Sequence, residues 1–170
     1  MGSFRRDFEI PQDWDGRETF ISFDGVDSFF YLWINGQYVG FSKNSRNTAD
    51  FNITPYLQKG KNTVAAEVYR SSDGSFLEAQ DMFRLPGIFR TVALYSVPKV
   101  HFRDLVATPD LDATYTDGSL TVNAEIRNLG KKAIKDYKVY YSLYANKLYS
   151  DENTLVDGFL SPVIDKIAPN

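Results

Sequence analysis

Three carboxylate side chains, Asp73, Glu78 and Asp81, fall within one segment, residues 71–87, that has neither strand nor helix periodicity. Two carboxyl groups held about 5 Å apart can act as an acid and a nucleophile when one of them has a raised pKa. Glu78 and Asp81 are three positions apart, which would bring them together only on a helix. Because the segment lacks a helical period, we do not expect this pair to be catalytic. Glu78 and Arg84 are instead expected to pair with charges that fix the loop, and Arg46 is interpreted as a loop anchor or an interface residue.

A lone aspartate such as Asp81 can still accept hydrogen bonds from hydroxyl groups and can ligate a hard cation. In a loop, an isolated aspartate is more often a turn former or a solvated charge, and Asp73-Gly74 is interpreted as a tight turn. A long irregular segment between strands is usually functional, however. The segment is therefore the candidate site, and the role of Asp81 depends on the residues around it.

Composition excludes several other kinds of site. The chain has no cysteine, so disulfides and thiolate chemistry are ruled out, and its only histidine, His101, has no surroundings typical of a triad or a metal site. The net charge is -3 and neither half is rich in Lys and Arg, so no nucleic-acid partner is expected. No apolar run approaches the ~20 residues of a membrane span, so no membrane partner is expected.

The elements that must position the segment are short strands. Asn35-Gly36 joins two apolar runs and predicts a tight hairpin, since both turn residues need positive φ. Thr54–Gly60 predicts one helical turn, with Thr54 as cap and Pro55 in the first helical position. Trp33 lies in a dense apolar strand, so we expect it in the core, and Trp14 is also given a structural role. The strands expected before Pro98 are Thr19–Phe23, Phe29–Ile34, Gln37–Phe41, Asn62–Tyr69 and Phe89–Ser96.

A domain boundary is expected at Pro98-Lys99. Beyond it, Leu120, Val122, Ala124 and Ile126 alternate with polar residues, which predicts a half-buried strand. Asp117-Gly118 is expected as a turn. Further strands are expected over Val100–Thr108 and over Tyr137–Tyr144, and Asp157-Gly158 with Val163-Ile164 suggest one more. These are about four strands, fewer than the seven of a complete immunoglobulin-type sandwich.

Three stretches resemble the N-terminal region of glycoside hydrolase family 2, and within it the long β-galactosidases. The third stretch, which combines Asp-Gly-Ser, Gln-Asp-Met and Gly-Ile-Phe-Arg at characteristic spacing, is the most specific. The stretches are Phe23-Asp24-Gly25-Val26-Asp27-Ser28 running into Trp33-Ile34-Asn35-Gly36, then Ser45-Arg46 with Ala49–Asn62, and then Arg70–Arg90.

This resemblance implies an all-β fold, with a galactose-binding-like jelly-roll β-sandwich over residues 4–98 followed by an immunoglobulin-like β-sandwich over residues 99–170. In the family, the jelly roll lends a loop to the active site of a (β/α)8 barrel that carries two catalytic glutamates. The aspartate of Gln-Asp-Met contacts substrate hydroxyls and a sodium ion there, which makes Asp81 the implied substrate-binding and metal-binding residue. The parent enzyme also uses Mg²⁺, and some members hold a magnesium-type ion near Asp73.

The implied parent is therefore a retaining β-galactosidase that acts on terminal β-D-galactosides. Met1-Gly2-Ser3 looks like an expression start and no barrel is present, so we expect a piece that is truncated at both ends and inactive alone. Phe83 stands where the family often has tryptophan. The expected partners are a β-galactoside, the parent's own barrel and possible copies of the same chain, in the cytoplasm or periplasm of a bacterium.

Two other functions fit parts of the sequence. The first is a free-standing carbohydrate-binding module with an immunoglobulin-like spacer, which would use aromatic residues and a few polar groups. The second is a structural or adhesion sandwich. The Gln80-Asp81-Met82 motif favours the enzyme, because a binding module would have no need for a loop matched to a barrel.

Overall fold

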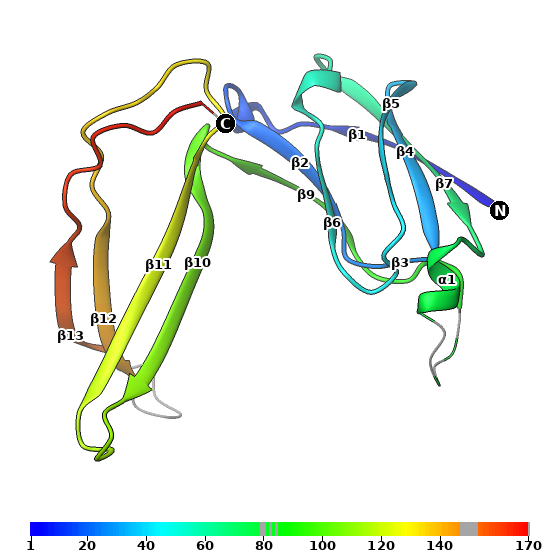
Figure 1. The fold of residues 1–170 in the computed structure, drawn as a ribbon. Coiled ribbons are helices and arrows are strands. Elements are labelled where there is room, and N and C mark those ends of the chain that lie inside the picture. The colour runs from blue at the N-terminus through cyan, green and yellow to red at the C-terminus, as the bar shows by residue number, and fades with distance from the viewer. Residues whose placement is uncertain (79–80, 82, 84, 147–152, 170) are drawn as a thin grey trace. The chain divides into compact units, whose positions relative to one another are not determined.

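The computed structural model describes residues 1–78, 81, 83, 85–146 and 153–169 (Figure 1). The chain divides into two compact units, Met1–Pro98 and Lys99–Asn170, each built from antiparallel strands. The all-β fold class predicted from the sequence is confirmed. No helix in the described part of the chain is long and apolar enough to cross a membrane.

The first unit is a β-sandwich. One sheet has four strands in the order β1-β7-β4-β5, the other has three in the order β6-β2-β9, and a small third sheet pairs β3 with β8. The strands are β1 (Gly2–Glu9), β2 (Glu18–Phe23), β3 (Val26–Asp27), β4 (Phe29–Ile34), β5 (Gln37–Ser42), β6 (Ala49–Asn52), β7 (Lys61–Tyr69), β8 (Gly87–Ile88) and β9 (Val92–Val97).

The core of this unit lies between the two larger sheets. Alternate residues of β4 enter it, and the ring of Phe30 lies 4.7 Å from that of Phe23 on β2. Nine buried hydrophobic side chains form the described core: Ile21, Phe23, Val26, Phe30, Leu32, Ile34, Ile53, Ala66 and Val68. The sandwich is thereby a rigid base for the loops at its ends.

The predicted hairpin is confirmed. Asn35 and Gly36 have φ of 51° and 78° and connect β4 to β5. The Asn35 side chain donates to the carbonyl of Tyr56 (2.9 Å) and to Oδ1 of Asn62 (2.8 Å), and it accepts from the amide of Thr63 (2.8 Å). Asn62 is fully buried, so this turn is tied to the start of β7.

The helical turn at residue 54 is a short 3-10 helix, Thr54–Tyr56, with Pro55 in its first turn as expected. The predicted cap is wrong, because Ile53 is the N-cap residue. Thr54 Oγ1 instead accepts from the amide of Thr19 (2.7 Å), which links the turn to β2. Another 3-10 helix, Gln12–Trp14, precedes β2 and leaves Trp14 half-buried.

Two further expectations for this unit need correction. The strand expected over Phe89–Ser96 begins only at Val92; residues 89–91 are in no strand and follow the separate short strand β8. Trp33 is not in the core: it lies on the outer face of β4, half-buried, because Leu32 and Ile34 take the inward positions. A strand that is apolar on both faces does not reveal which face is inward.

The second unit contains two hairpins among the described residues. β10 pairs with β11, and β12 pairs with β13. Asp157-Gly158, which suggested a further strand, lies inside β13 opposite Ser142 and Leu143, whereas Ile164 lies beyond the strand and forms an isolated bridge with Tyr137. The bounds are β10 (Val100–Leu111), β11 (Gly118–Asn128), β12 (Tyr140–Asn146) and β13 (Asn153–Leu160).

Candidate functional site

The candidate loop lies between β7 and β8. Its described part begins with a short helix, α1 (Gly74–Leu77), whose N-cap residue Asp73 accepts from the Gly74 amide. Its far end is pinned where β8 pairs with β3, with Val26 opposite Ile88 and Asp27 opposite Gly87. Both ends of the loop are therefore held by the sandwich.

The segment 43–46, between β5 and β6, anchors the loop from the side. At its start, Lys43 Nζ forms an ion pair with Asp73 Oδ2 at 2.9 Å. This contact with Lys43, together with the hydrogen bond from Gly74, lowers the pKa of Asp73. Asp73 is therefore a charged, ion-paired helix cap, and its carboxylate is already engaged.

Ser45 forms the buried part of the anchor. Its backbone amide donates to Glu78 Oε1 at 3.0 Å, and its hydroxyl donates to Glu78 Oε2. The same hydroxyl lies 3.4 Å from Oδ1 of the buried Asp27. Since Ser45 is only 2% exposed, these contacts are shielded from solvent and hold the loop firmly.

Arg46 and Arg90 enclose the ring of Phe89, with guanidinium carbons 5.0 and 5.2 Å from its centroid. Arg46 Nη2 also donates to the carbonyl of Phe83 at 3.4 Å. Phe89 lies so close over Gly25 that an added Cβ would be 2.7 Å from the ring. The Gly-Ile-Phe-Arg motif thus closes the loop onto the sandwich by cation–π contacts.

Asp81 is exposed and lies in the loop between Glu78 and Phe83. Gln80 and Met82 of its motif, and Arg84, which was expected to help fix the loop, lie outside the described residues. No group of three or more His, Cys, Asp or Glu side chains in the described residues could hold a metal ion. Among the described residues, Asp81 therefore belongs to no such group.

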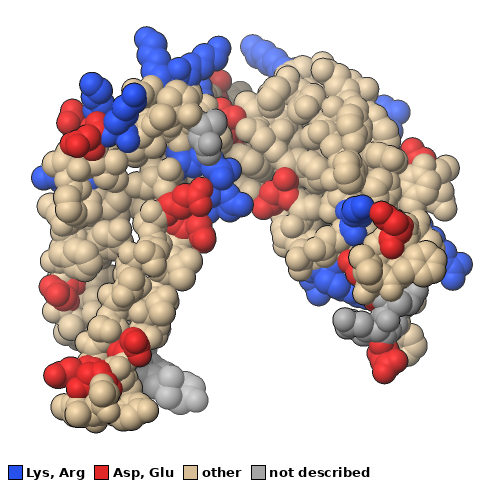
Figure 2. Space-filling view, viewed as in Figure 1, with Lys and Arg blue, Asp and Glu red and all other residues tan. Residues whose placement is uncertain are grey.

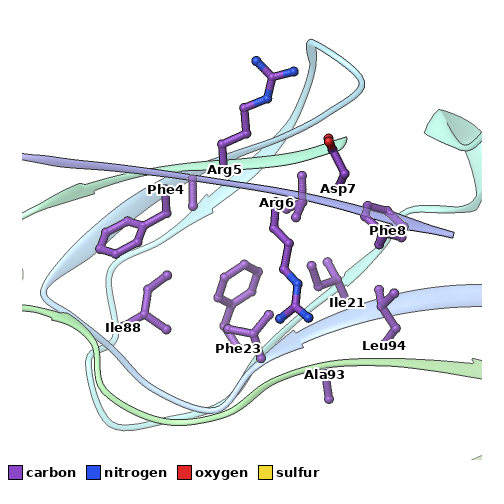
Figure 3. Close-up of a pocket in the computed structure, with 13 residues that line it drawn as sticks. Phe4, Arg5, Arg6, Asp7, Phe8, Ile21, Phe23, Ile88, Ala93 and Leu94 are labelled. Carbon is purple, nitrogen blue, oxygen red and sulfur yellow. The ribbon is translucent and has the colours of Figure 1, made fainter. Parts of the chain in front are cut away.

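A second candidate is a cavity of about 590 Å³ between β1 and the β2-β9 edge (Figure 3). Phe4, Arg6 and Phe8 of β1 project toward it, and Phe23 and Leu94 lie on the opposite wall. Its lining is mostly apolar, and it opens where two edge strands face each other without a strand between them in the described chain. This cavity is the open side of the sandwich core and lacks convergent polar groups for chemistry.

Figure 2 shows both basic and acidic side chains on the visible surface of each unit, without a continuous basic stripe.

The sequence identified part of this site. Arg46 was interpreted as a loop anchor or an interface residue, and its contacts with Phe83 and Phe89 agree with the anchor. Glu78 was expected to fix the loop by pairing with a charge; among the described residues it accepts hydrogen bonds from the neutral Ser45. Lys43 and Asp27 were missed, because their partners are far away in the sequence and no local pattern marks them.

Known proteins resemble this chain closely. Residues 1–98 match the family model described as glycosyl hydrolases family 2, sugar binding domain. The chain is 47% identical over 144 residues to a β-galactosidase of Priestia megaterium and 46% identical over 139 residues to one of Yersinia pestis bv. Antiqua. These alignments cover 85% and 81% of this chain, but only 14% and 13% of the two relatives.

Solved structures share the fold. The chain matches a β-glucuronidase of Bacteroides uniformis with a TM-score of 0.82 and 22% identity, over 98% of this chain and 20% of that one. It matches a β-glycosidase from Bacteroides vulgatus with a TM-score of 0.71 and 28% identity, over 93% of this chain and 19% of that one. With the family match over the sandwich that carries the anchored loop, the chain belongs to glycosyl hydrolase family 2 and contains its sugar binding domain.

Proposed function

We propose that this chain forms the non-catalytic β-domains of a retaining β-galactosidase, and that its anchored loop completes the active site of the parent's catalytic barrel. The proposal rests on a contrast within the loop. Asp73, Glu78 and Phe89 are fixed to the sandwich, whereas Asp81 is exposed. A functional side chain presented from a rigid base is well suited to position a substrate.

Asp81 is proposed to accept hydrogen bonds from galactoside hydroxyls and to supply one oxygen ligand to a sodium ion. A carboxylate suits both tasks. The other ligands would have to come from the barrel, since the described residues supply no complete set. Mg²⁺ is proposed for the parent only. Some members of the family hold such an ion near the position of Asp73, but in this chain Asp73 is paired with Lys43.

The test uses the full-length parent enzyme and a chromogenic β-galactoside. Asp81→Asn removes the charge with little change in volume. A hydrogen bond to a charged group contributes roughly 1.5–3 kcal/mol, so kcat/KM should fall about ten- to a hundredfold. Activation by Na⁺, measured against K⁺ at constant ionic strength, should weaken in the same variant.

Asp13→Asn is the matched control, because Asp13 is an exposed aspartate far along the chain from the loop and should leave both quantities unchanged. The 170-residue chain alone should show no hydrolysis, since the two carboxyl groups of a retaining site would be on the barrel. If the parent shows no glycosidase activity, a free-standing carbohydrate-binding module becomes the better explanation of this chain. An Asp81→Asn variant with wild-type kinetics would remove Asp81 from the site.

A further inference from the structure

Six aromatic side chains lie together on the outer face of the four-stranded sheet, away from the core. We call them the aromatic face. Tyr31 is at their centre, with the rings of Trp33, Tyr38 and Tyr69 at 5.9, 6.1 and 6.1 Å. The set is Phe29, Tyr31 and Trp33 on β4, Tyr38 and Phe41 on β5, and Tyr69 on β7.

Core packing does not account for this face. On β4 the alternate residues Phe30, Leu32 and Ile34 are at most 2% exposed and complete the core from the other side. Tyr38 and Phe41 are 50% and 52% exposed. The solvent-facing row of an antiparallel sheet is ordinarily polar, and a large exposed aromatic patch marks a binding surface.

Polar groups lie beside the rings on the same face. Glu67 is paired across the strands with Tyr31 and accepts from the Tyr69 hydroxyl at 2.7 Å, a contact that raises the pKa of Tyr69. Beyond Trp33 come the small Ala65 and then, on β1, Arg5. The face therefore changes from exposed rings on β5 to charged groups on β7 and β1.

This change from exposed rings to charged groups favours one kind of ligand for the aromatic face over another. The apolar centre of a protein partner would bury Glu67 and Arg5 without compensating partners, which costs free energy. A sugar chain combines apolar C–H faces, which pack on aromatic rings, with hydroxyls that hydrogen-bond to carboxylate, guanidinium and phenol groups. Ring spacings near 6 Å along Tyr31, Trp33 and Tyr38 allow neighbouring sugar units to contact different rings.

We propose that the aromatic face is a second carbohydrate site, which binds a chain of pyranose units independently of the Asp81 loop. Tyr38 and Phe41 supply the exposed stacking rings, Trp33 borders the site, and Glu67 hydrogen-bonds to sugar hydroxyls. The site holds a polymer without acting on it, so it does not depend on the proposed β-galactosidase activity.

The test uses the 170-residue chain with Trp14→Phe, so that Trp33 is the only indole and its fluorescence reports on the face. The probes are oligosaccharides of β-(1→4)-linked galactose, glucose and mannose. At least one series should give a saturable change whose affinity rises with chain length. Tyr38→Ala and Phe41→Ala should each weaken binding about three- to tenfold, as expected for losing one aromatic contact.

Phe102→Ala is the matched control, because Phe102 is an aromatic residue of the second unit with similar exposure, 55%. Glu67→Gln should weaken binding while the circular dichroism melt stays the same, which separates lost recognition from lost folding. Asp81→Asn should bind as wild type; if it abolishes the signal, the ligand is at the loop and the proposal fails. Failure of all three oligosaccharide series also overturns it. So does self-association that Tyr38→Ser abolishes, because the face is then a protein interface.

Discussion

At the scale of residues, the carboxylates of the loop have two different roles. Two of them hold the loop to the sandwich, and one is exposed to solvent. Glu78 and Asp73 are both used by the scaffold, the first by Ser45 and the second by Lys43. Asp81 is exposed beyond them. The different roles of these carboxylates could not be predicted from the sequence, because Lys43 and Asp73 are thirty positions apart and meet only in the folded chain.

The ion pair between Lys43 and Asp73 gives a prediction with its own internal control. Asp73 has a lowered pKa, so its contribution to stability is present above its ordinary pKa and is lost as pH falls through the lowered value. Lys43→Met should raise the pKa of Asp73 toward its ordinary value of about 3.9. A carboxyl carbon NMR titration measures this directly.

Lys61→Met is the matched variant. Lys61 pairs with Asp7 at 2.8 Å and is the main cause of the lowered pKa of Asp7. Each substitution should therefore shift only its own aspartate. If Lys43→Met leaves the titration of Asp73 unchanged, the ion pair is not formed in solution and the loop lacks this anchor.

At the scale of elements, β4 pairs with β7 along its length, and one buried side chain also ties the turn of the β4–β5 hairpin to the start of β7. Asn62 donates to the carbonyls of Gln58 (3.0 Å) and Gly60 (2.9 Å), and its Oδ1 accepts from the Gln58 amide and from Asn35. A buried amide with every partner satisfied fixes the exit of the 3-10 turn and the start of the strand together.

We predict that Asn62→Ala lowers the free energy of unfolding of the first unit by about 3 kcal/mol. The substitution leaves two carbonyls, an amide and the Asn35 side chain without their partner in a buried place. Urea unfolding followed by circular dichroism provides the measurement. Asn47→Ala, at an exposed position, should change the free energy by less than about 0.5 kcal/mol. Equal losses in the two variants would contradict a special role for Asn62.

The elements also show how far the sequence could predict the fold. The hairpin was predictable because the need of Asn35 and Gly36 for positive φ is local. The orientation of Trp33 was not, because β4 is apolar on both faces and only packing decides. The further strand suggested by Asp157-Gly158 and Val163-Ile164 includes the first pair but not the second, because the pairing with β12 ends at Leu160. Contacts between strands, rather than local preference, settled each of these cases.

At the scale of the whole first unit, the sandwich is open on one side. β1 and β9 are edge strands of their sheets in the described chain, and the cavity between them is lined by Phe4, Phe8, Phe23 and Leu94 (Figure 3). Unpaired strand edges beside an apolar cavity favour association with another chain. The charged side chain of Arg6 also reaches this opening, and an inward-directed charge opposes such pairing.

We predict that the 170-residue chain self-associates through this side as its concentration rises. Phe4 is 44% exposed and lies at the opening, so Phe4→Lys should reduce the association measured by sedimentation equilibrium, because a further charge at the edge opposes pairing. Tyr115→Lys, at an 80% exposed position in the second unit, is the control. A monomer at all concentrations, or equal effects of the two variants, would show that this side does not mediate association.

The hydrogen bonds at the hairpin also govern how the protein ages chemically. An Asn-Gly sequence loses ammonia when the glycine amide nitrogen attacks the asparagine side-chain carbonyl, and the resulting imide opens largely to isoaspartate. In Asn35 both the side-chain nitrogen and oxygen are held by Tyr56, Asn62 and Thr63, so the carbonyl cannot rotate freely toward Gly36. The folded chain should therefore keep Asn35 intact during long storage at mildly alkaline pH. Asn62→Ala should accumulate isoaspartate at this position, as detected by peptide mapping.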